Sequence, residues 1–277
     1  MCVKVISTAT IYKGSFLELF PKVFKMIIVL ISAIFIGLSL GILGSGGAIL
    51  TVPLLIYGLG YPEKLAIASA LAIVGSISAT TALIGIKQKK VNWTLVWYFG
   101  GPSMLSAYMG AWASSYVSGQ TQVMLLAVVM LAAAWKMFRS FEIQTPHKTN
   151  RLLTIMQGTG VGLLTGFVGV GGGFLIVPAL VLLGGITMQQ AVFTSLVVIS
   201  INSGAGFIKY QSILYQNNQL LDWSTIGIIS SIGIMGSFVG QYYSVALPQK
   251  KIKQAFAVFI TIMAIFILCQ KLLFTMW

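Results

Sequence analysis

Charged side chains are scarce in this sequence of 277 residues: they make up 8% of it, against 57% hydrophobic residues. A soluble globular domain carries roughly 25% charged residues, so this chain lacks the polar groups that would cover a surface in water. Its mean hydropathy of +0.96 and several apolar stretches of membrane-spanning length fit lipid as the solvent. The sequence therefore predicts a multi-pass protein of the cell membrane.

The chain is also poor in the residues that do acid–base and metal chemistry. It has four acidic residues, two cysteines and one histidine, His147, which falls in a polar stretch. Cys2 and Cys269 stand at opposite ends without metal or redox spacing. This inventory argues against an enzyme, and we expect no catalytic residues, no metal and no cofactor. No ATP-binding motif is present either, so direct ATP drive would require another subunit.

Basic residues give the chain a formal net charge of +13. They stand between apolar segments, as at 86–90 and 249–253, and no run is long or interleaved with aromatic residues. This placement is typical of positive-inside topology signals that touch anionic headgroups. We therefore expect the lipid bilayer, and not nucleic acid, as the partner of these charges.

Two stretches of the sequence align without a gap at an offset of 125, residues 41–53 with residues 166–178. After a five-residue insertion, Val-Asn-Trp at 91–93 matches Leu-Asp-Trp at 221–223, and Gly110 matches Gly240. The pattern predicts a tandem duplication: a first repeat over 26–140, a polar linker over 141–151 and a second repeat over 152–277. Residues 1–25 have no counterpart and are interpreted as an N-terminal extension, with Met26 as an alternative start.

The apolar segments predict an all-α fold, because backbone groups in lipid need partners within their own segment. Residues 26–57 as one helix would measure about 48 Å, which exceeds a hydrocarbon core of about 30 Å. Each half is therefore expected to hold a glycine-broken helix pair followed by three transmembrane helices. The expected segments are 26–43, 48–57, 64–86, 94–116 and 121–140 in the first half, and 152–168, 174–183, 187–209, 223–245 and 252–273 in the second.

Two topologies remain open from the sequence. If each glycine-broken unit crosses once, the N-terminus lies inside and Lys250, Lys251 and Lys253 fall on the outside. If each unit is a re-entrant hairpin, the two halves are inverted and these lysines lie inside together with Lys87 and Lys90. Segment lengths and the frequency of inverted repeats in transporters favour the second arrangement.

Consecutive glycines at membrane depth leave backbone N–H and C=O groups that need protein or a wet cavity as a partner. N–H groups at the start of the following helix, with its positive dipole end, form a site for an anion. We expect the two glycine turns to meet near the midplane and to form a substrate pocket. The candidate residues are Gly44, Ser45, Gly46, Gly47, Gly169, Gly171, Gly172 and Gly173.

The alternative is that glycines only permit close helix crossings. We assign this role to Gly37 with Gly41 and to Gly158 with Gly162, which stand four residues apart. Under the substrate-site interpretation Gly172→Leu abolishes flux, whereas Gly158→Ala is mild.

Polar side chains on the third segment of each half are a second group of candidates: Ser69, Thr194, Ser195 and Asn202. Intramembrane hydroxyls often bond to their own helix, so an amide such as Asn202, which needs a partner or a cavity, is more informative. No acid, lysine or histidine stands well inside any segment, which argues against a carboxylate proton relay.

From about Met26 to its end, the chain resembles the sulfite exporter TauE/SafE family of membrane transporters. The resemblance depends on the glycines at 44, 46 and 47 followed by Val-Pro at 52–53, on their repetition at 169–178, and on Ala-x-x-Thr-Ser-Leu at 191–196. It implies transport of sulfur-containing anions such as sulfite, sulfonates or thiosulfate. It also implies that the substrate path passes Gly46, Gly47, Pro53, Gly171, Gly172, Gly173, Pro178, Thr194 and Ser195.

The first half departs from this pattern, with Ser45 opposite Val170 and Ala70 opposite Ser195. The departure weakens the case for a symmetric site. We expect a secondary transporter of a small anion, with a passive anion channel, a transporter of another small organic anion and a membrane scaffold as the alternatives. The sequence leaves the direction of transport, the coupling ion and the oligomeric state open.

Overall fold

The computed structural model of the protein describes residues 27, 29–44, 46–139, 151–169, 173–182, 186–244 and 249–275, and all regular structure in these ranges is helical. The predicted all-α class is confirmed. Residues 1–25, Ser45, Gly171, Gly172 and most of the predicted linker lie outside the described residues, and the division into two repeats and a linker stays a prediction.

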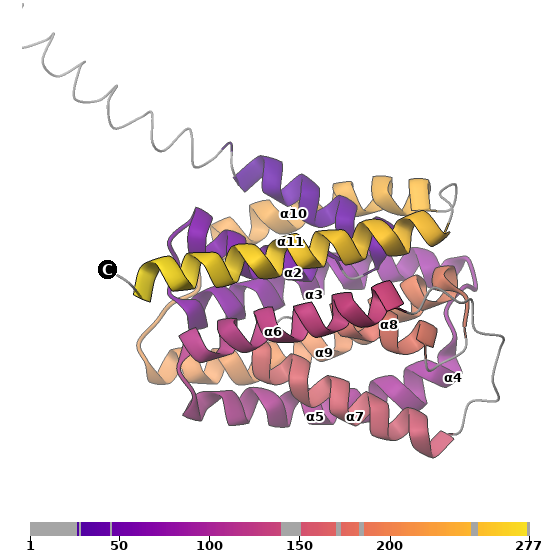
Figure 1. Cartoon of the computed structure of the whole chain (residues 1–277), viewed down its shortest axis with the longest axis horizontal. Helices are drawn as coiled ribbons and strands as arrows, with labels where there is room; N and C mark the ends of the chain where they lie inside the picture. Colours follow the sequence, from indigo (N-terminus) through magenta and orange to yellow (C-terminus); the bar gives the residue numbers. More distant parts are fainter. Residues whose placement is uncertain are drawn as a thin grey trace, which may run out of the picture.

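The helices follow the predicted segments closely (Figure 1). The first half contains the helix Val29–Leu43, α2 (Gly46–Pro53) with the π-helical η1 (Leu54–Gly58), α3 (Glu63–Lys87), α4 (Trp93–Leu95), the π-helical η2 (Val96–Gly100), α5 (Gly101–Ala113), the 3₁₀-helical η3 (Ser114–Tyr116) and α6 (Gly119–Arg139). The second half contains α7 (Arg151–Val168), α8 (Gly173–Leu182), α9 (Met188–Gln216), α10 (Trp223–Ser244) and α11 (Gln249–Thr275).

Three helices are long and apolar enough to cross a membrane: α3, the part Gln189–Gln216 of α9, and α10. Four further apolar helices are shorter, namely Val29–Leu43, Ile49–Gly58, Gly119–Trp135 and Ala257–Gln270. Large apolar side chains such as Trp97, Leu105 and Met235 are exposed on the outside of the bundle, where a soluble protein would carry charge. The chain is therefore an all-α membrane protein.

The first glycine break turns the chain back on itself. Gly44 has a φ of +69°, a conformation that glycine adopts without steric cost, and it ends the helix Val29–Leu43. Three residues later Gly47 packs against the carbonyl of Ile36 and the side chain of Leu40. The segment 29–58 is thus a hairpin of two helices, and the predicted break is confirmed. Gly169 has a φ of +74°, and α8 contacts α7 after this turn.

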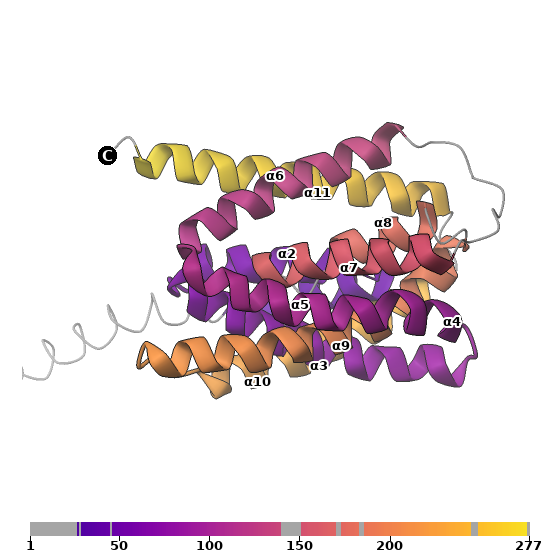
Figure 2. The same ribbon diagram turned by 90° about the horizontal axis from the view of Figure 1, so that it is seen from below.

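Helices α3 and α9 form an antiparallel pair at the centre. Gly75 packs against Ser203, Gly85 against Phe193, and Gly206 against Leu71. Most of the apolar window of each helix is buried, 61% for α3 and 67% for α9, against 39% for α10. The pair is therefore the core to which the other helices are added, while α6 and α11 cross each other as a layer on one side (Figure 2).

Glycines fix the closest helix contacts. A Cβ atom on Gly37 would collide with the carbonyl of Gly233, and one on Gly41 with the carbonyl of Ser237, so the first helix lies directly on α10. Gly158 and Gly162 likewise contact the carbonyls of Phe99 and Ser103. The expected packing role of these glycines is confirmed. The expectation that Gly158→Ala is mild is wrong, because the added methyl group would meet backbone.

One end of the bundle gathers basic residues, and we call it the lysine-rich end. Helix α3 ends there with Lys87, Lys89 and Lys90 following in sequence, α7 begins there at Arg151, and Figure 1 shows α10 ending and α11 beginning at the same end. At the opposite end the hydroxyl of Tyr61 donates to Asp222 Oδ2 at 3.0 Å, which joins the loop before α3 to the loop before α10.

Candidate functional site

The first glycine turn packs against the start of α9. Gly44 lies against the backbone of Val192 and the hydroxyl of Ser195. That hydroxyl donates to the carbonyl of Gly44 at 3.2 Å and to the carbonyl of Val192 at 2.8 Å. The structure therefore brings together two of the predicted site residues, Gly44 and Ser195, at the point where α2 is about to begin.

The second glycine turn packs against the start of α3 and is sealed by a buried polar cluster. Gly169 lies against Ile67 and the hydroxyl of Tyr210. Gln122 donates from Nε2 to the carbonyl of Phe167 at 2.7 Å and to the Tyr210 hydroxyl at 2.9 Å. The Tyr210 hydroxyl donates to the same carbonyl at 3.2 Å. Gln122 and Tyr210 are fully buried, so this cluster fills the space beside the turn.

The two turns do not meet at the midplane. The first lies beside Val192, next to the contact of Phe193 with Gly85, whereas the second lies beside Ile67. Positions 67 and 85 of α3 are separated by about 27 Å at about 1.5 Å per residue. The described residues of the two turns therefore form no common pocket in this conformation. Each turn accordingly lies near one end.

The predicted polar side chains of α3 and α9 have different partners. Thr194 accepts a hydrogen bond from the backbone N–H of Asn92 at 3.0 Å, so it holds the loop before α4. Asn202 donates from Nδ2 to the hydroxyl of Ser103 at 2.6 Å. The Ser69 hydroxyl and Asn202 Oδ1 are buried and have no partner among the described residues. Ser69 and Asn202 therefore remain free to accept or donate a further hydrogen bond.

The predicted prolines stand inside the returning helices, Pro53 in α2 and Pro178 in α8. A proline within a helix removes one backbone donor, and the π-helical η1 follows Pro53 directly. Gly46 and Gly173 are the first residues of α2 and α8, and Gly173 is buried.

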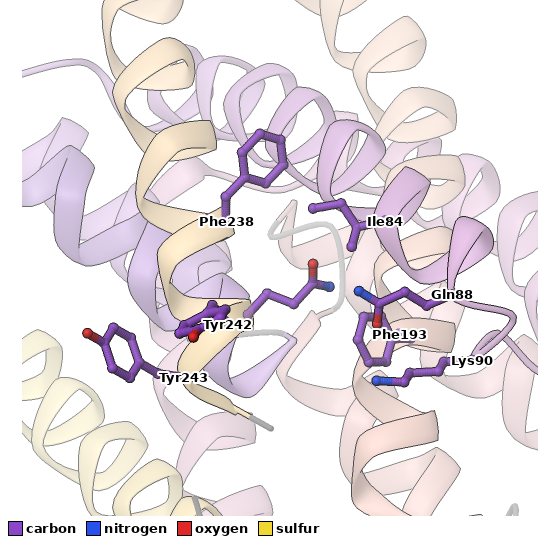
Figure 3. Close-up of a pocket in the computed structure, with 8 residues that line it drawn as sticks. Ile84, Gln88, Lys90, Phe193, Phe238, Tyr242 and Tyr243 are labelled. Atoms are coloured by element: carbon purple, nitrogen blue, oxygen red, sulfur yellow. The ribbon is translucent and has the colours of Figure 1, made fainter. Parts of the chain in front are cut away.

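A cavity of about 610 Å³ lies at the lysine-rich end, where α3 ends, α9 begins and α10 ends (Figure 3). It is next to the first glycine turn, because its wall residue Phe193 directly follows Val192, which Gly44 contacts. None of its lining residues is acidic. They are Ile84, Gln88, Lys90, Phe193, Phe238, Gln241, Tyr242 and Tyr243.

The backbone at the end of α3 positions Lys90, the cation among the described lining residues. Lys89 has a φ of +54° and directs the chain back, with the N–H of Lys90 donating to the carbonyl of Gly85 at 3.1 Å and that of Lys89 to Ile86 at 3.0 Å. These two bonds form a Schellman motif. The motif ends α3 and leaves the ammonium of Lys90 at 5.3 Å from the centre of the Phe193 ring.

Gln241 is the least satisfied polar side chain of the cavity. It is only 4% exposed, and neither its Nε2 nor its Oε1 has a hydrogen-bond partner in the described part of the chain. An unpaired buried amide costs about 1–3 kcal/mol per group. Such a side chain beside a cavity indicates a place where another molecule supplies the missing bonds.

Sequence reasoning missed Gln88, Lys90 and Gln241. Lys90 was interpreted as one topology signal among several, since its neighbours Lys87 and Lys89 are basic too. Gln241 had a usable signal, because it is an amide within the predicted apolar segment 223–245. Its contact with a cavity depends on the position of α9, which the sequence does not give.

The profile of the family described as sulfite exporter TauE/SafE matches residues 29–267. A protein named probable membrane transporter protein from Xylella fastidiosa is 27% identical over 256 residues, which cover 89% of this chain and 96% of that protein. One of the same description from Methanocaldococcus jannaschii is 29% identical over 68% of this chain and 74% of its own length. No solved structure gives a significant match.

Proposed function

The chain belongs to the sulfite exporter TauE/SafE family, its relatives are named as probable membrane transporters, and we propose that this membrane transporter moves a small sulfur-containing oxyanion or sulfonate across the cell membrane. Transport is secondary, driven by a gradient and not by ATP. The family and the names of the relatives point to a transporter rather than an enzyme.

The observation that carries the proposal is the composition of the cavity at the lysine-rich end. Its described lining contains one cation, Lys90, two amides, Gln88 and Gln241, and no carboxylate. The start of α2 is close to it through the contact of Gly44 with Val192. A positive side chain, amide donors and a helix N-terminus all favour an anion.

Inverted halves are part of the proposal. The packing recurs under the offset of 125: Gly44 against Val192 has its counterpart in Gly169 against Ile67. The lysine-rich end would face the cytoplasm by the positive-inside rule. Inverted repeats of this kind support alternating access, in which one half rocks against the other around a fixed site.

The glycine turns act in this proposal as gates at the two ends of the path. Gly44 of the first turn lies beside Val192 and Ser195, whereas Gly169 of the second lies beside the buried cluster of Gln122 and Tyr210. A turn that packs against buried polar side chains favours a transporter, which closes one end of its path, over an open anion channel. Ser69, Pro53, Pro178, Thr194, Ser195 and Asn202 would border the route between them.

The experiment that tests the function is uptake and efflux of radiolabelled sulfite, thiosulfate and sulfate in proteoliposomes, with and without a pH gradient. Saturable, protein-dependent flux of at least one sulfur oxyanion is expected. A pH gradient that changes the rate would identify proton coupling. Flux of none of the three, with carboxylates transported instead, would remove the sulfur-anion assignment.

A further inference from the structure

The cavity at the lysine-rich end is larger than an inorganic oxyanion requires. Its volume of about 610 Å³ falls within the 300–1,000 Å³ typical of sites for small organic molecules, whereas one water molecule occupies about 30 Å³ in the liquid. The surplus space is bordered by the aromatic rings of Phe238 and Tyr242, which are exposed, whereas Phe193 in the same lining is fully buried. A bare ion would leave the exposed faces of Phe238 and Tyr242 without contacts.

Polar groups and rings occupy different parts of the lining. Figure 3 shows Gln88 and Lys90 extending from the α3 side toward the cavity, with Phe238 and Tyr242 across from them on α10. Gln241, also on α10, contributes an amide that is 96% buried, being 4% exposed, with both polar atoms unpaired. The cavity thus offers a cation and amide donors for a charged head, and apolar walls for a body.

We propose that this cavity binds an organic anion, with an oxyanion head on Lys90 and Gln241 and an apolar body against Phe238 and Tyr242. The inference rests on the proposed function, since the cavity would be the cytoplasmic entrance of the same path, and it ranks organic anions above inorganic sulfite as ligands of that entrance. The head accepts the hydrogen bond that Gln241 Nε2 has available.

The site belongs to one end of the path only. Gly240 aligns with Gly110, so the counterpart of Gln241 is Ala111, which is buried and apolar. Gln88 has a polar counterpart, because it is the C-cap residue of α3 and Asn217 is the C-cap residue of α9. The second glycine turn therefore lacks an equivalent of the Gln241 amide, and substrate affinity is expected to differ between the two membrane faces.

Binding to the purified full-length protein in phosphatidylcholine nanodiscs tests the proposal. Benzenesulfonate and benzoate share an apolar body and differ in their heads, sulfite has the head without the body, and benzyl alcohol has the body without the charge. Calorimetric titration should show benzenesulfonate or benzoate binding at least tenfold more tightly than sulfite and benzyl alcohol. The preferred head distinguishes a sulfonate site from a carboxylate site.

Variants connect the binding to the cavity. Lys90→Gln and Gln241→Leu should each weaken binding of the preferred probe at least tenfold, and Lys90→Arg should restore most of it. Lys87→Gln is the matched control. It removes the same charge as Lys90→Gln, but Lys87 stands three residues earlier and its side chain does not line the cavity. Unchanged size-exclusion profiles and melting temperatures no lower than that of the wild type would verify folding, because Gln241→Leu removes an unpaired buried amide and should stabilise the fold. Phe238→Ala should weaken binding of the same probe from the opposite wall.

The outcomes separate this site from the function. Flux of sulfite with unchanged probe affinity in Lys90→Gln and Gln241→Leu would overturn the site and leave the proposed function intact. Binding of benzenesulfonate that needs Lys90, without flux of any sulfur anion, would overturn the function and keep the site. Sulfite binding as tightly as both aromatic anions, or a phospholipid retained by the wild type and lost in Lys90→Gln, would also overturn the inference.

Discussion

At the scale of single residues, Asp222 caps α10 at the end of the bundle opposite the lysines. Its Oδ1 accepts from the N–H groups of Ser224 at 3.1 Å and Thr225 at 3.2 Å, while its Oδ2 accepts from the hydroxyls of Thr225 and Tyr61. The hydrogen bond from the Thr225 hydroxyl is the main cause of a lowered pKa for this carboxyl.

This capping predicts a specific dependence of stability on pH. Since the pKa of Asp222 is lower in the folded than in the unfolded state, its contribution is complete above the unfolded value of about 3.9 and is lost as the pH falls further. Asp222→Ala should cost about 1 kcal/mol at pH 7, and Asp222→Asn much less. Melting temperatures of the wild type and the two variants between pH 7 and pH 3 measure these effects. If the melting temperatures of the wild type and Asp222→Asn differ by as much below pH 4 as at pH 7, the pKa shift is contradicted.

Residue chemistry also limits what the sequence reveals about the site. Gly44 and Ser195 were predicted and lie in contact, because glycine runs and hydroxyls in apolar segments are conspicuous. Lys90 and Gln241 were not predicted as site residues, since lysines near helix ends are usually topology signals and a lone amide shows no periodicity. Their importance comes from a Schellman turn and a neighbouring helix that only the folded chain brings together.

At the scale of elements, two glycines of α7 form a matched pair. A Cβ on Gly158 would meet the carbonyl of Phe99, whereas a Cβ on Gly160 meets nothing within 4 Å. Gly158→Ala should therefore cost about 1–3 kcal/mol through overpacking, and Gly160→Ala should stabilise the helix by up to about 1 kcal/mol. Melting temperatures of the two variants in the same detergent check this, and equal values would show that η2 and α7 do not cross so closely.

Helix positions were largely predictable because apolar runs bounded by loops or glycines leave few alternatives in lipid. The expected segment 64–86 corresponds to Glu63–Lys87 and 223–245 to Trp223–Ser244. The positions of the glycine turns were not predictable. They depend on how far the helices Val29–Leu43 and α7 extend along the α3–α9 pair, and hydropathy does not report how helices are staggered.

At the scale of the whole molecule, inverted halves predict which loops face each side of the membrane. In a variant with Cys2→Ser and Cys269→Ser, Leu220→Cys should react with a membrane-impermeant maleimide in intact cells. Lys87→Cys should react only after permeabilisation if, as proposed, the lysine-rich end faces the cytoplasm. Both positions are exposed, so accessibility within the protein does not decide the result. The reverse labelling pattern would place the lysine-rich end outside the cell. Labelling of both positions from the same side of the membrane would exclude the inverted arrangement of the halves.

The most direct test of the transporter account is counterflow of sulfite. Proteoliposomes loaded with unlabelled sulfite and diluted into a trace of labelled sulfite should accumulate label transiently above equilibrium, since a carrier that alternates between two faces exchanges bound substrate. Lys87→Gln should behave as the wild type does. Label that merely rises to equilibrium at a protein-dependent rate would indicate a passive channel, and no protein-dependent entry of label would contradict the account.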